Sequence, residues 1–121
     1  MADELTVTAH VRLNDTTTGL SISSPTAAKQ FSPGTVQGAS FVVDVGTSEE
    51  SVAFGDITPG TICLENLDPT NYVEFSTVTT NYDLRLPAGN GRALITFSGA
   101  QTLYLKANTS SCKVLVTAVN T

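Results

Sequence analysis

Apolar and polar residues alternate one by one in short runs along this 121-residue chain. Side chains of a β-strand point alternately to opposite faces, so a period of two is typical of a strand with one buried face. The runs cover 5–13, 39–45, 92–97, 103–107 and 113–119. Turn-forming residues separate them, and no amphipathic run of helical length appears. The pattern predicts an all-β protein, a single-domain antiparallel β-sandwich (jelly-roll-like or a related barrel) over residues 1–121.

The segment 61–75, with the sequence TICLENLDPTNYVEF, combines two such runs with a compact turn. Ile62 and Leu64 share one face of the first run, and Val73 and Phe75 share one face of the second. The Asp-Pro and Thr-Asn pairs between them are turn formers, because proline presets φ and Asp and Asn side chains bond nearby backbone groups. We therefore expect a β-hairpin-like unit whose turn sets the strand register.

The segment 24–38 has the weakest pattern of the chain, because prolines and glycines interrupt it. Phe31 is its one large apolar residue. We expect a long irregular loop or arm over 24–38, with at most a short strand, and as an arm it would contact a neighbouring subunit.

The last run, 113–119, is apolar on both faces. Leu115 and Val119 occupy the face opposite that of Val114 and Val116. A strand of this kind is usually central in a sandwich or covered by a partner. The pattern predicts a central strand whose second face is either a subunit interface or buried within one sandwich.

The charge balance argues against nucleic acid as a partner. Eleven acidic residues outnumber six basic ones, for a net charge of −5. The basic residues are scattered and form no stripe that could follow a phosphate backbone. We expect no direct contact with DNA or RNA.

The chain begins Met-Ala-Asp-Glu, which is acidic where a signal peptide would be basic, and no apolar stretch approaches membrane-spanning length. We expect a protein made in the cytoplasm with no membrane partner. Cys63 and Cys112 each lie in a strand-like run. Without a secretion signal, two free thiols are the expectation, and a disulfide between neighbouring strands is the alternative.

Residues with reactive chemistry do not form a recognisable site. His10 is the only histidine and falls on the polar face of the first run. A catalytic role would need a second titratable partner, and zinc would need several ligands at a characteristic spacing. Five acids are candidates for acid–base couples or calcium ligands but fit neither pattern: Asp44, Glu49, Glu50, Asp56 and Glu65. The sequence predicts no catalytic, cofactor-binding or metal-binding residues and a protein that is not an enzyme.

The three tyrosines are candidates for a binding surface. Tyr72 and Tyr104 alternate with inward-facing residues, and together with Tyr82 they are candidates for an exposed aromatic patch. An exposed aromatic patch serves contacts with protein or carbohydrate. The alternative is that each ring packs singly on a sheet surface.

Several ordered segments resemble a group of small structural proteins of tailed bacteriophages. They are VGTSEE at 45–50, GDI at 55–57 followed by PG at 59–60, ENLDPTNYVE at 65–74 and LKANT at 105–109. The resemblance covers about the C-terminal two-thirds of the chain. This chain departs from the group's pattern at Leu86-Pro87 and in its Asn120-Thr121 end, where an acidic tail is common.

The resemblance implies a virion component without enzymatic activity. The preferred expectation is a capsid decoration (cement) protein, located in the virion, that binds major capsid subunits and stabilises the head. A homo-oligomer is expected, with a trimer as one candidate. The alternatives are a tail, neck or head-fibre component and, from another class, a carbohydrate-binding β-sandwich.

Overall fold

The computed structural model describes residues 5–14, 16–19, 21–24, 29–31, 38–55 and 57–120. Contacts divide the chain into two units, Met1–Gly34 and Thr35–Thr121, which are described separately. Every regular element among the described residues is a strand, which confirms the all-β class. No helix in this part of the chain is long and apolar enough to cross a membrane. The expectation of one domain over residues 1–121 stays a prediction.

The N-terminal unit is a ribbon that contains two antiparallel strand pairs. Strand β1 pairs with β4, and β2 pairs with β3. Their bounds are β1 (Leu5–Val7), β2 (Arg12–Asn14), β3 (Ser21–Ser23) and β4 (Lys29–Phe31). Between the two strand pairs, the Ser24 amide donates to the Val11 carbonyl at 2.8 Å.

The expectation that the run 5–13 has one buried apolar face is wrong for Ala9 and Val11. Both are exposed, and Val11 is 72% exposed, because a two-stranded ribbon has no second layer of its own to cover a face. The expected arm or loop at 24–38 falls largely outside the described residues. Within it, β4 is a regular strand.

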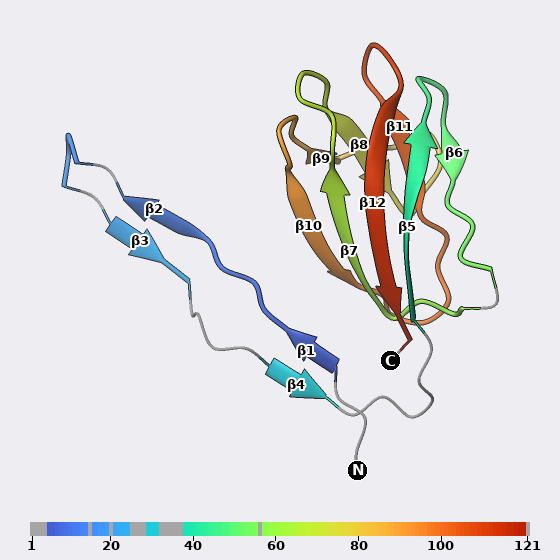
Figure 1. Ribbon diagram of the computed structural model, residues 1–121, viewed down its shortest axis with the longest axis horizontal. Coiled ribbons are helices and arrows are strands. Elements are labelled where there is room, and N and C mark those ends of the chain that lie inside the picture. The colour runs from blue at the N-terminus through green and yellow to red at the C-terminus, as the bar shows by residue number, and fades with distance from the viewer. Residues whose placement is uncertain are drawn as a thin grey trace. The chain divides into compact units, whose positions relative to one another are not determined.

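The C-terminal unit contains two antiparallel sheets of four strands each (Figure 1). One sheet has the order β10-β7-β12-β5, and the other has the order β6-β11-β8-β9. The first comprises β5 (Gly38–Val45), β7 (Thr61–Asn66), β10 (Arg92–Thr96) and β12 (Cys112–Val119). The second comprises β6 (Glu50–Ser51), β8 (Val73–Ser76), β9 (Leu84–Leu86) and β11 (Tyr104–Ala107).

The core lies between the inner faces of these two sheets, in a sandwich-like arrangement. Its largest fully buried apolar side chains come from both sheets and from the connections: Val45, Ile62, Leu64, Val73, Leu86, Leu103, Leu105, Val114 and Val116. Strand β12 pairs with β5 on one side and β7 on the other, which confirms its predicted central position. Its second apolar face, Leu115 and Val119, is half-buried on the outside of the sheet and is not part of the core.

The predicted hairpin at 61–75 is wrong. Strands β7 and β8 are consecutive, but they belong to opposite sheets and do not pair. The segment between them is an arch that carries the chain from one sheet to the other. The alternation was correctly identified, but its turn chemistry serves a crossing between layers.

A buried amide holds this arch. Asn66 is 0% exposed, and its Nδ2 donates to the carbonyls of Asn71 at 2.8 Å, Leu86 at 3.2 Å and Pro87 at 3.3 Å. Its Oδ1 accepts from the Asp68 amide at 3.0 Å. One side chain therefore joins the end of β7, the arch and the end of β9.

The turn that follows β9 has the backbone geometry expected from its sequence. Gly89 and Asn90 have φ values of 75° and 67°, in the region that glycine and asparagine adopt more readily than other residues. Gly91 is required for a different reason, because an added Cβ would lie 2.3 Å from the Pro87 carbonyl oxygen. The Gly91 backbone thus lies so close to the Pro87 carbonyl that no side chain fits at position 91.

Replacing Asn66 with alanine should lower the free energy of unfolding by about 3 kcal/mol, because buried carbonyls and the Asp68 amide would lose their partner. Urea unfolding followed by fluorescence or circular dichroism measures this change. Asn81→Ala, at an exposed position, is the control and should change stability by less than about 0.5 kcal/mol. Equal effects of the two substitutions would contradict the structural role of Asn66.

Candidate functional site

The outer face of the β6-β11-β8-β9 sheet carries a row of alternating charge. Lys106 lies directly opposite Glu74, and Glu74 lies directly opposite Arg85. All three point outward, because their chain neighbours Leu105 and Leu86 are buried on the inner face. The row therefore runs positive, negative, positive across β11, β8 and β9.

The three tyrosines share this face. Tyr104 lies two residues before Lys106 on β11, and Tyr72 lies two residues before Glu74. Tyr82 comes from the connection between β8 and β9, and its ring approaches Lys106. All three tyrosines are half-buried. We call this surface the tyrosine face and define it by Tyr72, Glu74, Tyr82, Arg85, Tyr104 and Lys106.

Two of the rings pack against cations. The guanidinium carbon of Arg85 lies 3.8 Å from the centroid of the Tyr72 ring, and Lys106 Nζ lies 5.2 Å from that of Tyr82. Such contacts are favourable because the ring face is electron-rich. No tyrosine pair stacks within the described residues. The arrangement combines both expectations, since the rings gather on one face but do not pack against one another.

Glu49 fixes the position of Tyr82. One carboxylate oxygen, Oε2, accepts from the Thr80 amide at 2.8 Å and from the Tyr82 hydroxyl at 2.7 Å. Thr80 has a positive φ of 63°, a backbone conformation that an L-residue holds only with local support. Glu49 precedes β6, so it ties the connection 77–83 to the opposite edge of the same sheet.

These bonds shift the acidity of both partners in opposite directions. The Thr80 amide and then the Tyr82 hydroxyl, with the nearby Lys106 charge, hold the pKa of Glu49 below its ordinary value. Burial and then the hydrogen bond to Glu49 raise the pKa of Tyr82. At neutral pH the phenol is therefore a stable donor and the carboxylate a stable acceptor.

The contact between His10 and Ser23 is the nearest approach to a nucleophile–base pair. His10 Nε2 lies 2.8 Å from Ser23 Oγ, on the exposed N-terminal ribbon. The Ser23 hydroxyl donates to the Ser24 carbonyl at 3.1 Å, and no acid bonded to the imidazole is seen among the described residues. The orienting third group of a catalytic triad is therefore missing from this part of the chain.

The candidate acids are used in other ways. Glu65 pairs with Arg92 at 2.7 Å, and Asp44 pairs with Lys113 at 2.8 Å, both on the outer face of the other sheet. Glu50 accepts from the Gly46 amide at 2.8 Å. In the described ranges, no three His, Cys, Asp or Glu side chains are placed to hold a metal ion. Asp56 lies outside the described residues.

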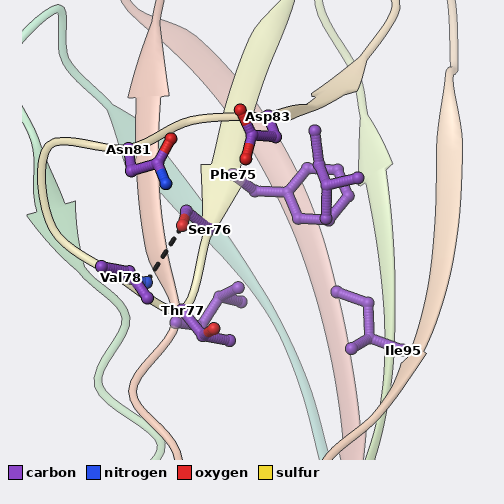
Figure 2. Close-up of a pocket in the computed structure, with 9 residues that line it drawn as sticks. Phe75, Ser76, Thr77, Val78, Asn81, Asp83 and Ile95 are labelled. Carbon is purple, nitrogen blue, oxygen red and sulfur yellow. Dashed lines mark hydrogen bonds between the residues drawn. The ribbon is translucent and has the colours of Figure 1, made fainter.

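A hollow of about 260 Å³ opens between β9 and β10, at the lateral edge of the sandwich (Figure 2). Phe75, Leu84, Ile95 and Leu103 supply its apolar lining. In Figure 2 Val78, Asn81 and Asp83 lie along the connection between β8 and β9, with Ile95 across the hollow on β10. The volume is below that of most small-molecule sites and is suited to about one side chain.

Both cysteines are free, as predicted. Cys63 is half-buried on the outer face of β7, whereas Cys112 is 2% exposed in the core. Burial, followed by the nearby Asp68 charge, raises the pKa of the Cys112 thiol, which keeps it protonated and unreactive. Neither cysteine contributes to the tyrosine face.

Sequence reasoning identified the tyrosines but missed Arg85 and Glu49 as their partners. The alternation of Arg85 with Leu84 and Leu86 was visible, and it predicts an outward arginine. The contact with Tyr72 depends on which strands pair, which the alternation does not determine. Glu49 fits neither acid pattern considered from the sequence, and its bond to Tyr82 spans 33 positions.

The lowered pKa of Glu49 predicts how stability depends on pH. A folded-state pKa below the unfolded value stabilises the protein above the ordinary carboxyl range, and this stability is lost as pH falls through the folded pKa. Glu49→Gln should therefore reduce the slope with which the free energy of unfolding falls between about pH 6 and about pH 3. Asp68, whose pKa is lowered by the Asn71 and then the Thr70 amide, leaves part of the slope.

Urea unfolding at a series of pH values measures the effect, with Asp83→Asn as the matched control at an exposed carboxyl. The control should keep the wild-type slope. An unchanged slope in Glu49→Gln would contradict the role assigned to Glu49.

No protein-family model, no curated protein and no solved structure matches this chain. The likeness of segments such as 65–74 and 105–109 to phage structural proteins stays an expectation.

Proposed function

We propose that this chain is a structural protein of a bacteriophage virion, a capsid decoration protein that binds major capsid subunits through its tyrosine face. The observation that carries the proposal is the gathering of Tyr72, Tyr82 and Tyr104 on one sheet face with two cations and an acid. The resemblance in the C-terminal two-thirds of the chain supplies the virion context.

The composition of the tyrosine face supports protein recognition. Tyrosine and arginine dominate the residues whose loss most weakens protein–protein complexes. Tyr72 and Tyr82 each have a cation beside the ring, and Glu49 holds the Tyr82 hydroxyl. Side chains already held in place lose less conformational entropy on binding. The face is thus prearranged for a flat protein partner.

The charge row favours a partner with the complementary order. Lys106, Glu74 and Arg85 would meet a negative, positive, negative arrangement on the capsid surface. The physical role would be added buried area across the joints between capsid subunits. Weak contacts repeated over the shell strengthen one another through multivalency, most of all if the chain is a homo-oligomer.

Carbohydrate binding is the less favoured alternative. A sugar platform needs an open aromatic face, and in Tyr72 the Arg85 guanidinium lies 3.8 Å over one face of the ring. The alternatives within the virion, a tail, neck or head-fibre component, would use the same kind of protein-binding surface. They differ from a decoration protein in how many copies each particle carries.

The double substitution Tyr72→Ala and Arg85→Ala tests the proposal. Binding to shells assembled from the major capsid protein of the same virus, without this chain, is measured by co-sedimentation. The double variant should bind at least about tenfold more weakly, because it removes a packed ring and its cation. The control, Leu94→Ala with Thr96→Ala, changes the outer face of the other sheet and should bind as the wild type does.

Melting temperatures of both variants establish that they are folded. Equal binding by the two double variants would contradict docking through the tyrosine face. Failure of the wild-type chain to bind such shells, together with binding on a glycan array, would favour the carbohydrate alternative.

A further inference from the structure

The two sheets of the C-terminal unit have four edge strands of very different length. Strands β6, β9 and β10 have 2, 3 and 5 residues, whereas β5 has 8. An edge strand presents unpaired backbone groups that can pair with another chain, and proteins limit this by keeping edges short. Only the β5 edge of this sandwich is long.

The β5 edge also lacks the other common forms of protection. Its pairing with β12 runs through all eight positions without a bulge, and its sequence, GASFVVDV, contains no proline. Asp44, its one charged residue, is paired with Lys113 on the neighbouring strand. Val42 is 53% exposed, and Phe41 and Val43 are only partly buried. Among the described residues of the C-terminal unit, the edge is thus regular, apolar and open.

The hydrogen bonds of β12 show which β5 backbone groups point away from the sheet. The carbonyls of Lys113 and Val119 accept from amides on the β7 side, so the odd-numbered residues of β12 face β7. Backbone groups alternate in direction along a strand, so the even-numbered residues of β12 face β5. They lie opposite the odd-numbered residues of β5. Consequently Ser40, Val42 and Asp44 direct their amide and carbonyl groups outward.

We propose that β5 pairs in antiparallel fashion with β5 of a second copy of this chain, in a two-fold symmetric dimer. In the proposed register Val42 lies opposite Val42 of the copy, and Ser40 lies opposite Asp44 of the copy. The outward backbone groups of these residues then bond to each other. The β10-β7-β12-β5 sheet of one copy and the same sheet of the other copy then form one continuous sheet of eight strands.

The occupant and the register follow from self-complementarity. Residues on the same face must meet, so the pairing can shift only by two positions within one partner strand. One shift would place Val42 opposite Asp44 of the copy, and the other would place Val42 opposite Ser40 of the copy. Both shifts would remove the Ser40–Asp44 match. The chosen register joins apolar to apolar and a hydroxyl donor to a carboxylate. It also brings Phe41 opposite Val43 of the copy, which covers both partly buried side chains.

The mass of the purified full chain in solution tests the dimer directly. Sedimentation velocity over a range of concentrations should show a reversible species of twice the 12.6 kDa chain mass. Val42→Pro removes an outward amide while leaving the bonds to β12 intact, and Val42→Lys places like charges opposite each other. Each should raise the dissociation constant at least about tenfold. Val42→Thr, which keeps the shape and the amide, is the matched control and should dimerise as the wild type does.

A crosslink tests the register. In a Cys63→Ser background, Val42→Cys should form a disulfide between copies under mild oxidation, since paired residues of this kind have Cα atoms about 5.5 Å apart. Leu94→Cys, equally on the outer face but on the β10 edge, should not crosslink. The buried Cys112 stays in both variants.

A monomer at all concentrations, a trimer, or a dimer that persists in folded Val42→Lys would each overturn the proposal. So would a Leu94→Cys crosslink in place of the Val42→Cys crosslink. Melting temperatures separate lost pairing from lost folding, and Val42→Lys keeps the test valid if Val42→Pro does not fold. These measurements use the chain alone, so they are independent of the binding of capsid shells.

Discussion

The sandwich depends on one buried amide at the point where the chain leaves one sheet for the other. Asn66 donates to the carbonyl of Asn71 in the arch and to that of Leu86 at the end of β9. These two carbonyls lie at the two ends of the segment 71–86. Tyr72 follows directly after Asn71, and Arg85 precedes Leu86. The same side chain therefore positions both members of the ring–cation contact on the tyrosine face, although it is itself fully buried.

A second remote residue holds the other half of that face. Glu49 accepts hydrogen bonds from the Thr80 amide and the Tyr82 hydroxyl, and the Tyr82 ring lies beside Lys106. The surface is thus arranged by hydrogen bonds that originate outside it. Reactive groups elsewhere in the described residues are consumed in ion pairs, buried or left without an orienting partner. A prearranged aromatic and charged surface on a rigid sandwich is suited to binding a macromolecule.

The sequence predicted those features that depend on local chemistry. Alternation predicted the all-β class, and two apolar faces predicted the central position of β12. Alternation is the same whether two strands pair in one sheet or face each other across a sandwich. The hairpin expected at 61–75 was wrong for that reason. The Asn66 bond to Pro87, which helps to hold the arch, spans 21 positions and therefore leaves no local pattern in the sequence.

The same limit applies to the site and to the N-terminal ribbon. Outward tyrosines were predictable, but their convergence depends on which strands are neighbours. The buried face expected for 5–13 requires a second layer, and the two-stranded pairs described in this unit supply none of their own, so Val11 is exposed.

The number of copies of this chain in each purified particle tests the central claim most directly. Quantitative mass spectrometry, with the major capsid protein as the internal reference, measures that number. A decoration protein that binds repeating sites over the shell should be present in on the order of hundreds of copies per particle. About six or twelve copies would place the chain at the neck or tail and contradict the account, and its absence from the particle would contradict a virion role altogether.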